Sequence, residues 1–242
     1  MKIKYITIIA FVLAIAVSSC NIVDGRRING NGKVTTKTYD LKNFSQIDVG
    51  HSMKVYLSQG NNYEVKIETD ENLFDFLNVR VDEENVLDVD VANNTNLDAT
   101  GEIKVYITAP SLDQVELSGA AEIETKGKFA QDKKIKFDIS GASSGNISVR
   151  APMVELDASG ASTLTVDGES KDIEVDASGA STINAFDLMS ENAAVESSGA
   201  STARVFSSIA LNARANGAST IKYKGNPKVT SDASGASSIT KE

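Results

Sequence analysis

The phrase Ser-Gly-Ala-Ser recurs through the second half of this chain at a nearly constant interval. Two copies vary, reading Ser-Gly-Ala-Ala at residues 118–121 and Asn-Gly-Ala-Ser at residues 216–219. Successive glycines are 22, 19, 19, 20, 18 and 18 residues apart. A period this regular predicts a repeat architecture in which neighbouring units stack on one another. The glycines of the seven copies are Gly119, Gly141, Gly160, Gly179, Gly199, Gly217 and Gly235.

Each repeat unit reads as a strand, a tight corner and a second strand. In one unit Val154, Leu156 and Ala158 alternate with polar residues before the phrase, and residues 163–167 alternate in the same way after it. Alternation with a period of two indicates a β-strand with one face buried and the other in water. A unit of this size cannot bury its apolar face alone, so adjacent units must share a core.

The length of the repeat indicates the kind of stack. At ~3.3 Å per residue, a unit of about 20 residues closes a coil roughly 60 Å around, and coils stack about 4.8 Å apart. The Leu-x-x-Leu-x-Leu pattern of leucine-rich repeats is missing, and two-helix repeats need longer periods. We therefore predict an all-β fold, a single-stranded parallel β-helix (β-solenoid) with coils of 18–22 residues.

The recurring phrase suits the corner of such a coil. Glycine adopts backbone angles closed to other residues, and the alanine that follows is expected to point inward where the tube is narrow. The flanking serines are expected to form hydroxyl ladders between adjacent corners. A ligand-binding loop is the alternative, but seven near-identical copies at coil spacing favour the structural role. The predicted corner alanines are Ala120, Ala142, Ala161, Ala180, Ala200, Ala218 and Ala236.

Residues 1–19 read as a bacterial lipoprotein signal peptide. Lys2 and Lys4 precede an apolar run at residues 6–17 that is too short to span a membrane comfortably. The run ends in Val-Ser-Ser-Cys, which resembles the lipobox of bacterial lipoproteins, where the peptide is cut before an acylated cysteine. Cys20 is the only cysteine, so it is the predicted lipidation site and no intrachain disulfide can form. An ordinary secretory signal is the alternative.

The rest of the chain divides by regularity. Residues 20–32 comprise the lipidated cysteine and a polar, glycine-rich tether. Residues 33–117 form an irregular β region, either wide coils continuous with the solenoid or a layer that caps it. Residues 118–242 form the regular Ser-Gly-Ala-Ser β-helix. The run Val49-Gly50-His51-Ser52 reads as a degenerate copy of the corner.

Two stretches resemble a known protein family. They are Phe44-Ser-Gln-Ile-Asp-Val-Gly-His-Ser-Met-Lys-Val-Tyr-Leu-Ser-Gln-Gly60 and Val115-Glu-Leu-Ser-Gly-Ala120, the latter followed by the reiterated phrase. Both resemble the putative auto-transporter adhesin, head GIN domain family. The resemblance covers Lys33 to the C-terminus and implies a right-handed β-helix in a lipoprotein or secreted protein, periplasmic or surface-facing. The family supplies no catalytic residues, and its pattern has a small residue where His51 stands.

Composition excludes several functions. A net charge of −9 argues against nucleic-acid binding, which depends on Lys and Arg neutralising phosphates. The chain has one histidine and one cysteine, too few for a zinc site built from these residues. His51 lies beside no recognisable nucleophile motif, so we expect it to face solvent at a turn. No cofactor is predicted.

An acidic column is the best candidate for chemistry. The residues three positions before each glycine would point outward, one above another, and stacked carboxylates repel unless solvent, salt or a cation relieves them. A solvated acidic face is favoured, and a Ca²⁺ ladder at Asp138, Asp157 and Asp176 is the alternative. The column consists of Glu116, Asp138, Asp157, Asp176, Glu196, Arg214 and Asp232.

The sequence therefore predicts a non-enzymatic outer-membrane lipoprotein, periplasmic or surface-facing. It would serve as an adhesin or surface interaction module for an unknown protein or glycan ligand. One alternative is a carbohydrate-active enzyme acting on anionic glycans, with Arg204 and Arg214 as its basic residues. Another is a structural envelope protein that self-associates. Only five residues follow the last phrase, so unpaired strand edges there are expected to allow end-to-end self-association.

Overall fold

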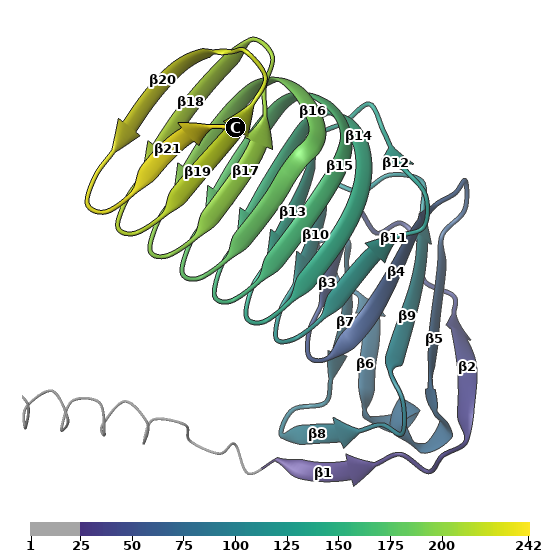
Figure 1. Cartoon of the computed structure of the whole chain (residues 1–242). Helices are drawn as coiled ribbons and strands as arrows, with labels where there is room; N and C mark the ends of the chain where they lie inside the picture. The colour runs from purple at the N-terminus through teal and green to yellow at the C-terminus, as the bar shows by residue number, and fades with distance from the viewer. Residues whose placement is uncertain (1–24) are drawn as a thin grey trace, which may run out of the picture.

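The computed structural model describes residues 25–242, and in it the chain winds into a stack of β-coils (Figure 1). The predicted signal peptide and Cys20 lie outside the described residues. Nineteen strands join in one continuous sheet and two form a separate small one. The predicted fold class, an all-β parallel β-helix, is confirmed. Within residues 25–242 no helix has the length and apolar character needed to cross a membrane.

The strands that run into each corner stack on one another and are called here the leading stack. They pair in parallel from the N-terminal to the C-terminal end of the solenoid. In spatial order they are β7 (Val86–Val91), β3 (Gln46–Val49), β10 (Gln114–Leu117), β13 (Ile135–Ile139), the later parts of β14 (Ser144–Ala158), β15 (Thr163–Ala177) and β16 (Thr182–Ser197), then β18 (Ala210–Ala215) and β20 (Lys228–Ala233).

The strands that leave each corner form a second parallel pile, the trailing stack. Three long strands, β14, β15 and β16, bend midway and so belong to both stacks (Figure 1). In order, the trailing stack is β9 (Ile103–Ala109), β4 (Met53–Gln59), β11 (Glu122–Thr125), the early parts of β14, β15 and β16, then β17 (Thr202–Phe206), β19 (Thr220–Lys224) and β21 (Ser238–Lys241). The short β12 (Phe129–Ala130) pairs with β14 at the bend.

The core lies between the two stacks and is built from alternate residues of each strand. Val154, Leu156 and Ala158 are buried as predicted, while their polar neighbours face outward. The column two positions before each glycine narrows from Leu117 to Ala215, and these residues are buried. The side chains that fill the core at this column therefore become smaller towards the C-terminal end.

Residues 33–117 contain both coils and antiparallel strands. β3 and β4 form one coil, and β7 and β9 form another whose corner is replaced by a longer segment with β8 (Thr95–Asp98). β6 (Leu77–Val81) pairs antiparallel with β7, β5 (Glu64–Asp70) with β9, and β2 (Val34–Tyr39) with β5. The 3-10 helix η1 (Glu71–Phe76) joins β5 to β6, and β1 (Arg26–Asn29) pairs with β8. Antiparallel strands thus close this end.

The corners are held by a backbone hydrogen bond between successive coils. The N–H of Ala161 donates to the carbonyl of Gly141 at 2.8 Å, and that of Ala180 to Gly160 at 2.8 Å. All seven corner glycines have φ between +70° and +76°. A Cβ on Gly160 would stand 2.6 Å from the oxygen of Gly141. Glycine is therefore required both by its backbone angle and by the closeness of the preceding coil.

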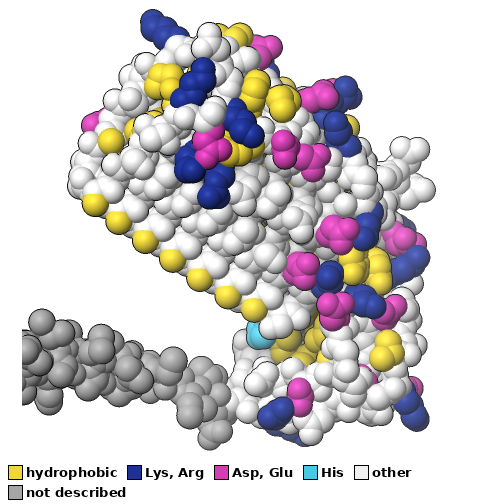
Figure 2. Space-filling view, viewed as in Figure 1, with side chains coloured by type: hydrophobic (Ala, Val, Ile, Leu, Met, Phe, Trp, Pro, Cys, Tyr) yellow, Lys and Arg dark blue, Asp and Glu magenta, His cyan; other side chains and the backbone are white. Residues whose placement is uncertain are grey.

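The corner alanines were wrongly predicted to point inward. All seven are exposed, and they form the row of yellow side chains along one edge in Figure 2. The corner uses two outward-facing residues, the glycine and the alanine, so the residue that returns to the interior is the one after them. That residue is Ser143, Ser162, Ser181, Ser201 or Ser219, each buried.

From Ser162 onward the buried serines connect adjacent coils, but not through the expected hydroxyl ladder, whereas the Oγ of Ser143 has no hydrogen-bond partner. The Oγ of Ser181 donates to the carbonyl of Ala158 in the preceding coil at 2.9 Å, and the Oγ of Ser201 to Ala177 at 2.8 Å. Ser219 repeats the contact to Ser197 at 2.8 Å. Each of these carbonyls also accepts a backbone N–H from the following coil, that of Ser178, Ser198 or Asn216. The hydroxyl therefore supplies the second hydrogen bond that a carbonyl oxygen can accept.

Replacing one corner glycine should destabilise the solenoid. Gly160→Ala would place a Cβ against the Gly141 carbonyl and impose a left-handed backbone on alanine, costing about 2 kcal/mol or more. Urea unfolding followed by circular dichroism measures the loss. Gly101→Ala is the control, because its Cβ would meet nothing within 4 Å. Equal stability of the two variants would contradict the role of the corner.

Candidate interaction surfaces

The acidic column runs the length of the leading stack and is longer than the repeat alone predicted. Asp48 pairs in register with Glu116 on one side and with Asp88 on the other, so both extend the column into the N-terminal coils. Arg80 contacts Asp88 at 2.7 Å, and Arg214 contacts Glu196 at 2.8 Å. Two arginines therefore neutralise carboxylates near opposite ends of the column.

One lysine neutralises the middle of the column. The Nζ of Lys136 lies 3.1 Å from Asp138 Oδ2 and 2.6 Å from Asp157 Oδ2, so it bridges two successive rungs. The hydrogen bond to Asp157 is the main cause that raises the pKa of Lys136. On the next rung the pKa of Asp176 is raised, first by burial and then by the charges of Asp157 and Glu196. Lys136 therefore neutralises Asp138 and Asp157 but forms no ion pair with Asp176, which is the next carboxylate in the column.

Asp48 is the most perturbed carboxyl group of the column. Its pKa is raised to about 6, first by burial and then by the negative charges of Glu116, Asp88 and Asp90. The cause is geometric, because in-register parallel pairing places these carboxylates on neighbouring strands. The sequence did not reveal this group, since Asp48 precedes the degenerate corner and falls outside the regular repeat.

The proposed calcium positions line a shallow hollow of about 230 Å³. Asp138, Asp157 and Asp176 lie on its wall with Ser159 and Ser178. Within residues 25–242, no three histidine, cysteine or acidic side chains are grouped so that they could hold a metal ion. Lys136 already supplies a positive charge to two of the three carboxylates. The arrangement fits a charged surface better than a calcium ladder.

A larger trough lies on the same leading stack, with a volume of about 470 Å³. Its floor includes Ala194 and Ala210, which are outward positions that carry longer side chains on other coils. Around them lie Asp172, Glu174, Asn192, Asn212 and Lys228. Sequence reasoning missed the trough. Comparing outward residues coil by coil would have found it, because only small side chains at adjacent rungs can leave a depression.

His51 occupies the place of a corner glycine. Its φ is +63°, and its carbonyl accepts a hydrogen bond from Ala120 at 3.0 Å, as glycines do in later coils. This confirms that residues 49–52 are a degenerate corner. The side chain is half-exposed and its Nδ1 lies 2.5 Å from Asp90 Oδ1. It faces solvent as expected, but it is paired with an acid that the sequence did not identify as its partner.

The two arginines considered for an enzyme do not converge. Arg204 lies on β17 of the trailing stack, where its Nη1 donates to Asn184 Oδ1 at 2.7 Å. Arg214 lies on β18 of the leading stack beside Glu196. The two therefore belong to different faces of the solenoid.

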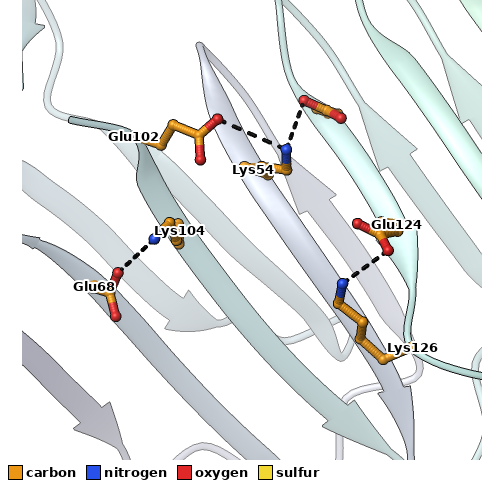
Figure 3. A network of polar contacts seen from close by, with 7 residues as sticks. Lys54, Glu68, Glu102, Lys104, Glu124 and Lys126 are labelled. Atoms are coloured by element: carbon orange, nitrogen blue, oxygen red, sulfur yellow. Dashed lines mark hydrogen bonds and ion pairs between the residues drawn. The ribbon is translucent and has the colours of Figure 1, made fainter.

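The N-terminal part of the trailing stack carries a polar network (Figure 3). Lys54 lies 3.4 Å from Glu122 and 3.7 Å from Glu102, and further lysine–glutamate pairs flank it. The rings of Tyr56 and Tyr106 stack at 5.1 Å on the same face. Lys126 covers the Tyr56 ring at 4.4 Å from its centroid. These side chains satisfy one another across neighbouring strands and leave little for a ligand.

Comparison with models of protein families identifies the family of this chain. The model described as "Putative auto-transporter adhesin, head GIN domain" matches residues 43–227, from just before the degenerate corner to the last bend. The chain belongs to this family. The match includes every corner except the last, so the repeating coils are part of the head GIN domain itself.

Solved structures share the fold at low sequence identity. A putative adhesin from Bacteroides fragilis NCTC 9343 is 20% identical with a TM-score of 0.79, over 89% of this chain and 100% of that one. A putative lipid binding protein from Parabacteroides distasonis ATCC 8503 is 18% identical with a TM-score of 0.72, over 90% and 100%. A putative adhesin from Parabacteroides merdae ATCC 43184 is 18% identical with a TM-score of 0.71, over 90% and 99%. A comparison with curated proteins gives no match.

Removing the charge of Asp48 should stabilise this head GIN domain at high pH. Because its folded pKa of about 6 lies above the ordinary value of 3.8, stability is lost as pH rises between these values. Asp48→Asn should raise the free energy of unfolding by about 1 kcal/mol at pH 8, since the group is half-exposed, and change it little at pH 4. Urea unfolding at both pH values tests this. Asp132→Asn, on an exposed turn, is the control, and an equal gain at both pH values would contradict it.

Proposed function

We propose that this protein is a non-enzymatic lipoprotein of the cell envelope that acts as an adhesin or surface interaction module. The adhesin description of its family and of two similar structures supports an interaction role. The solenoid suits that role because in-register coils make flat, rigid faces whose side chains repeat at about 4.8 Å. Such a face binds without a large ordering cost, since its backbone is already fixed.

The leading stack is the proposed binding face. We choose this stack because both the trough of about 470 Å³ and the acidic hollow of about 230 Å³ lie on it. The trough combines an alanine floor with amide and carboxylate groups that can donate and accept hydrogen bonds. A partner protein or glycan could therefore lie along the solenoid and contact several coils at once.

Anchoring is proposed through acylated Cys20. The residue itself lies outside the described residues, and the support is the lipobox-like sequence that surrounds it. A lipoprotein anchor carries more than one acyl chain, which holds a protein stably where a single chain does not. The tether would place the solenoid on the outer membrane, facing the periplasm or the exterior.

Catalysis on anionic glycans is less well supported. The basic residues considered for it, Arg204 and Arg214, lie on different stacks and each has a local partner. The residues of the larger trough include one lysine, Lys228, at its edge. A proton-abstracting base facing several acids would need a more convergent arrangement.

Binding should be tested with the acyl-free mature chain, residues 21–242, on arrays of host matrix proteins and glycans, with the products analysed for cleavage. Saturable binding without cleavage supports the proposal. Ala194→Arg would fill the trough and should weaken binding at least tenfold, a loss of about 1.4 kcal/mol. Thr36→Arg, at an exposed position of β2, is the matched control. Shortened glycans, or equal binding by both variants, would contradict the proposal.

The anchor has its own test in cells. Cys20→Ser should move the protein from the membrane pellet to the soluble fraction and abolish labelling with radioactive palmitate, because acylation needs the thiol. The fold should be unchanged, as judged by circular dichroism. Membrane retention of the Ser variant would contradict a lipoprotein anchor.

A further inference from the structure

A basic patch lies on the trailing stack at the C-terminal coils. Arg204 on β17 pairs in register with Lys222 on β19, and Lys224 follows two residues along the same strand face. Figure 2 shows dark blue side chains gathered over these coils in the upper part of the view. The chain as a whole has a net charge of −9. Positive charge is therefore concentrated here against the overall balance.

The partners of these cations are mostly neutral. Arg204 donates to the amide oxygen of Asn184 at 2.7 Å, and the Nζ of Lys224 lies over the Phe186 ring, 4.3 Å from its centroid. Among the described residues, Lys222 is the only one of these three cations that is paired with a carboxylate, that of Glu242 at 2.6 Å. Like charges on adjacent strands repel, so a negatively charged group bound to the patch would relieve this repulsion.

Glu242 shows what the patch accepts. Its Oε1 receives the hydrogen bond of Lys222, and that bond is the main cause that lowers the pKa of Glu242. The charges of Lys224 and Arg204 lower it further. Three cations from two coils therefore act on one carboxylate. The side chain behaves as a built-in occupant of an anion site.

We propose that the patch formed by Arg204, Lys222 and Lys224 binds the carboxylates of a linear acidic glycan, with Glu242 displaced. This inference rests on the proposed interaction role and adds a second binding site, on the trailing stack, with its ligand class. The backbone positions of cations on adjacent coils are about 4.8 Å apart, and those two residues apart on one strand about 6.6 Å, a regular spacing that suits a polymer with regularly spaced charges.

Neighbouring groups favour a sugar chain over other anions. The partly exposed Phe186 ring offers an apolar face for the C–H groups of a sugar. Asn184 is in register with Arg204, and Thr202 and Thr220 form the neighbouring outward row two residues earlier; all three can hydrogen-bond hydroxyl groups. The three cations are spread over two adjacent coils, so a ligand that makes several weak contacts along its chain gains the most affinity here.

The test uses the mature protein, purified in detergent, and polygalacturonate as the probe, with binding followed by isothermal titration calorimetry. Methyl-esterified polygalacturonate is the matched ligand control, because it keeps the sugar chain and removes its charge. Binding to the acid form should fall steeply between 50 and 200 mM salt, as the Debye length shortens from about 14 to about 7 Å.

Two variants should act in opposite directions. Lys222→Gln should lower the affinity about fivefold, whereas Glu242→Gln should raise it about threefold because it removes the internal competitor. Lys66→Gln is the control variant, since Lys66 is also paired with a glutamate on the outward face of an N-terminal strand. Thermal unfolding of all variants establishes that they remain folded.

Equal binding of the methyl ester, or weaker binding by Glu242→Gln, would overturn the inference. So would binding to phosphatidylglycerol vesicles but not to polygalacturonate, which would identify a lipid headgroup as the anion. If polygalacturonate does not bind while other array ligands do, this inference is wrong and the proposed function is still supported. If no array ligand binds at all, the proposed function fails as well.

Discussion

The backbone hydrogen bond at the corner is the interaction on which this solenoid depends. It joins the alanine N–H of one coil to the glycine carbonyl of the coil before, so it fixes the sharp bend and the register of both stacks together. Once register is fixed, every side chain stacks on its counterpart about 4.8 Å away. Inward columns build the core, and outward columns become continuous lines of similar side chains, such as the corner alanines and the acidic column. The composition of each column therefore determines the character of each face.

Most of the fold could be predicted from the sequence because the repeat states it several times. The glycine period indicated the corners, and alternation at residues such as Val154 and Leu156 indicated which face is buried. The acidic column followed from the same alignment. Its extension through Asp48 and Asp88 did not, because it crosses from the regular repeat into coils separated by long insertions. Only pairing in space reveals that they share a column.

The errors have physical causes. Alanine was expected inside because it is small and apolar, but a corner with two outward residues reverses the alternation and brings the following serine inside. The trough at Ala194 and Ala210 exists because two neighbouring coils both lack a long outward side chain there. A single repeat unit does not show such a coincidence. The basic patch joins residues 18 to 38 positions apart in sequence, as Arg204, Lys222 and Glu242 are. A search for local motifs does not bring them together.

In-register columns also govern how the length of such a molecule can change. The coil between Gly141 and Gly160, for example, is 19 residues long and presents the same corner to both neighbours. Loss or duplication of a whole coil would leave the remaining corners able to join, whereas loss of one residue within a strand would turn its apolar side chains outward. The length of the solenoid can thus change only in steps of one coil, about 4.8 Å each. A lineage can lengthen or shorten the solenoid without redesigning the fold.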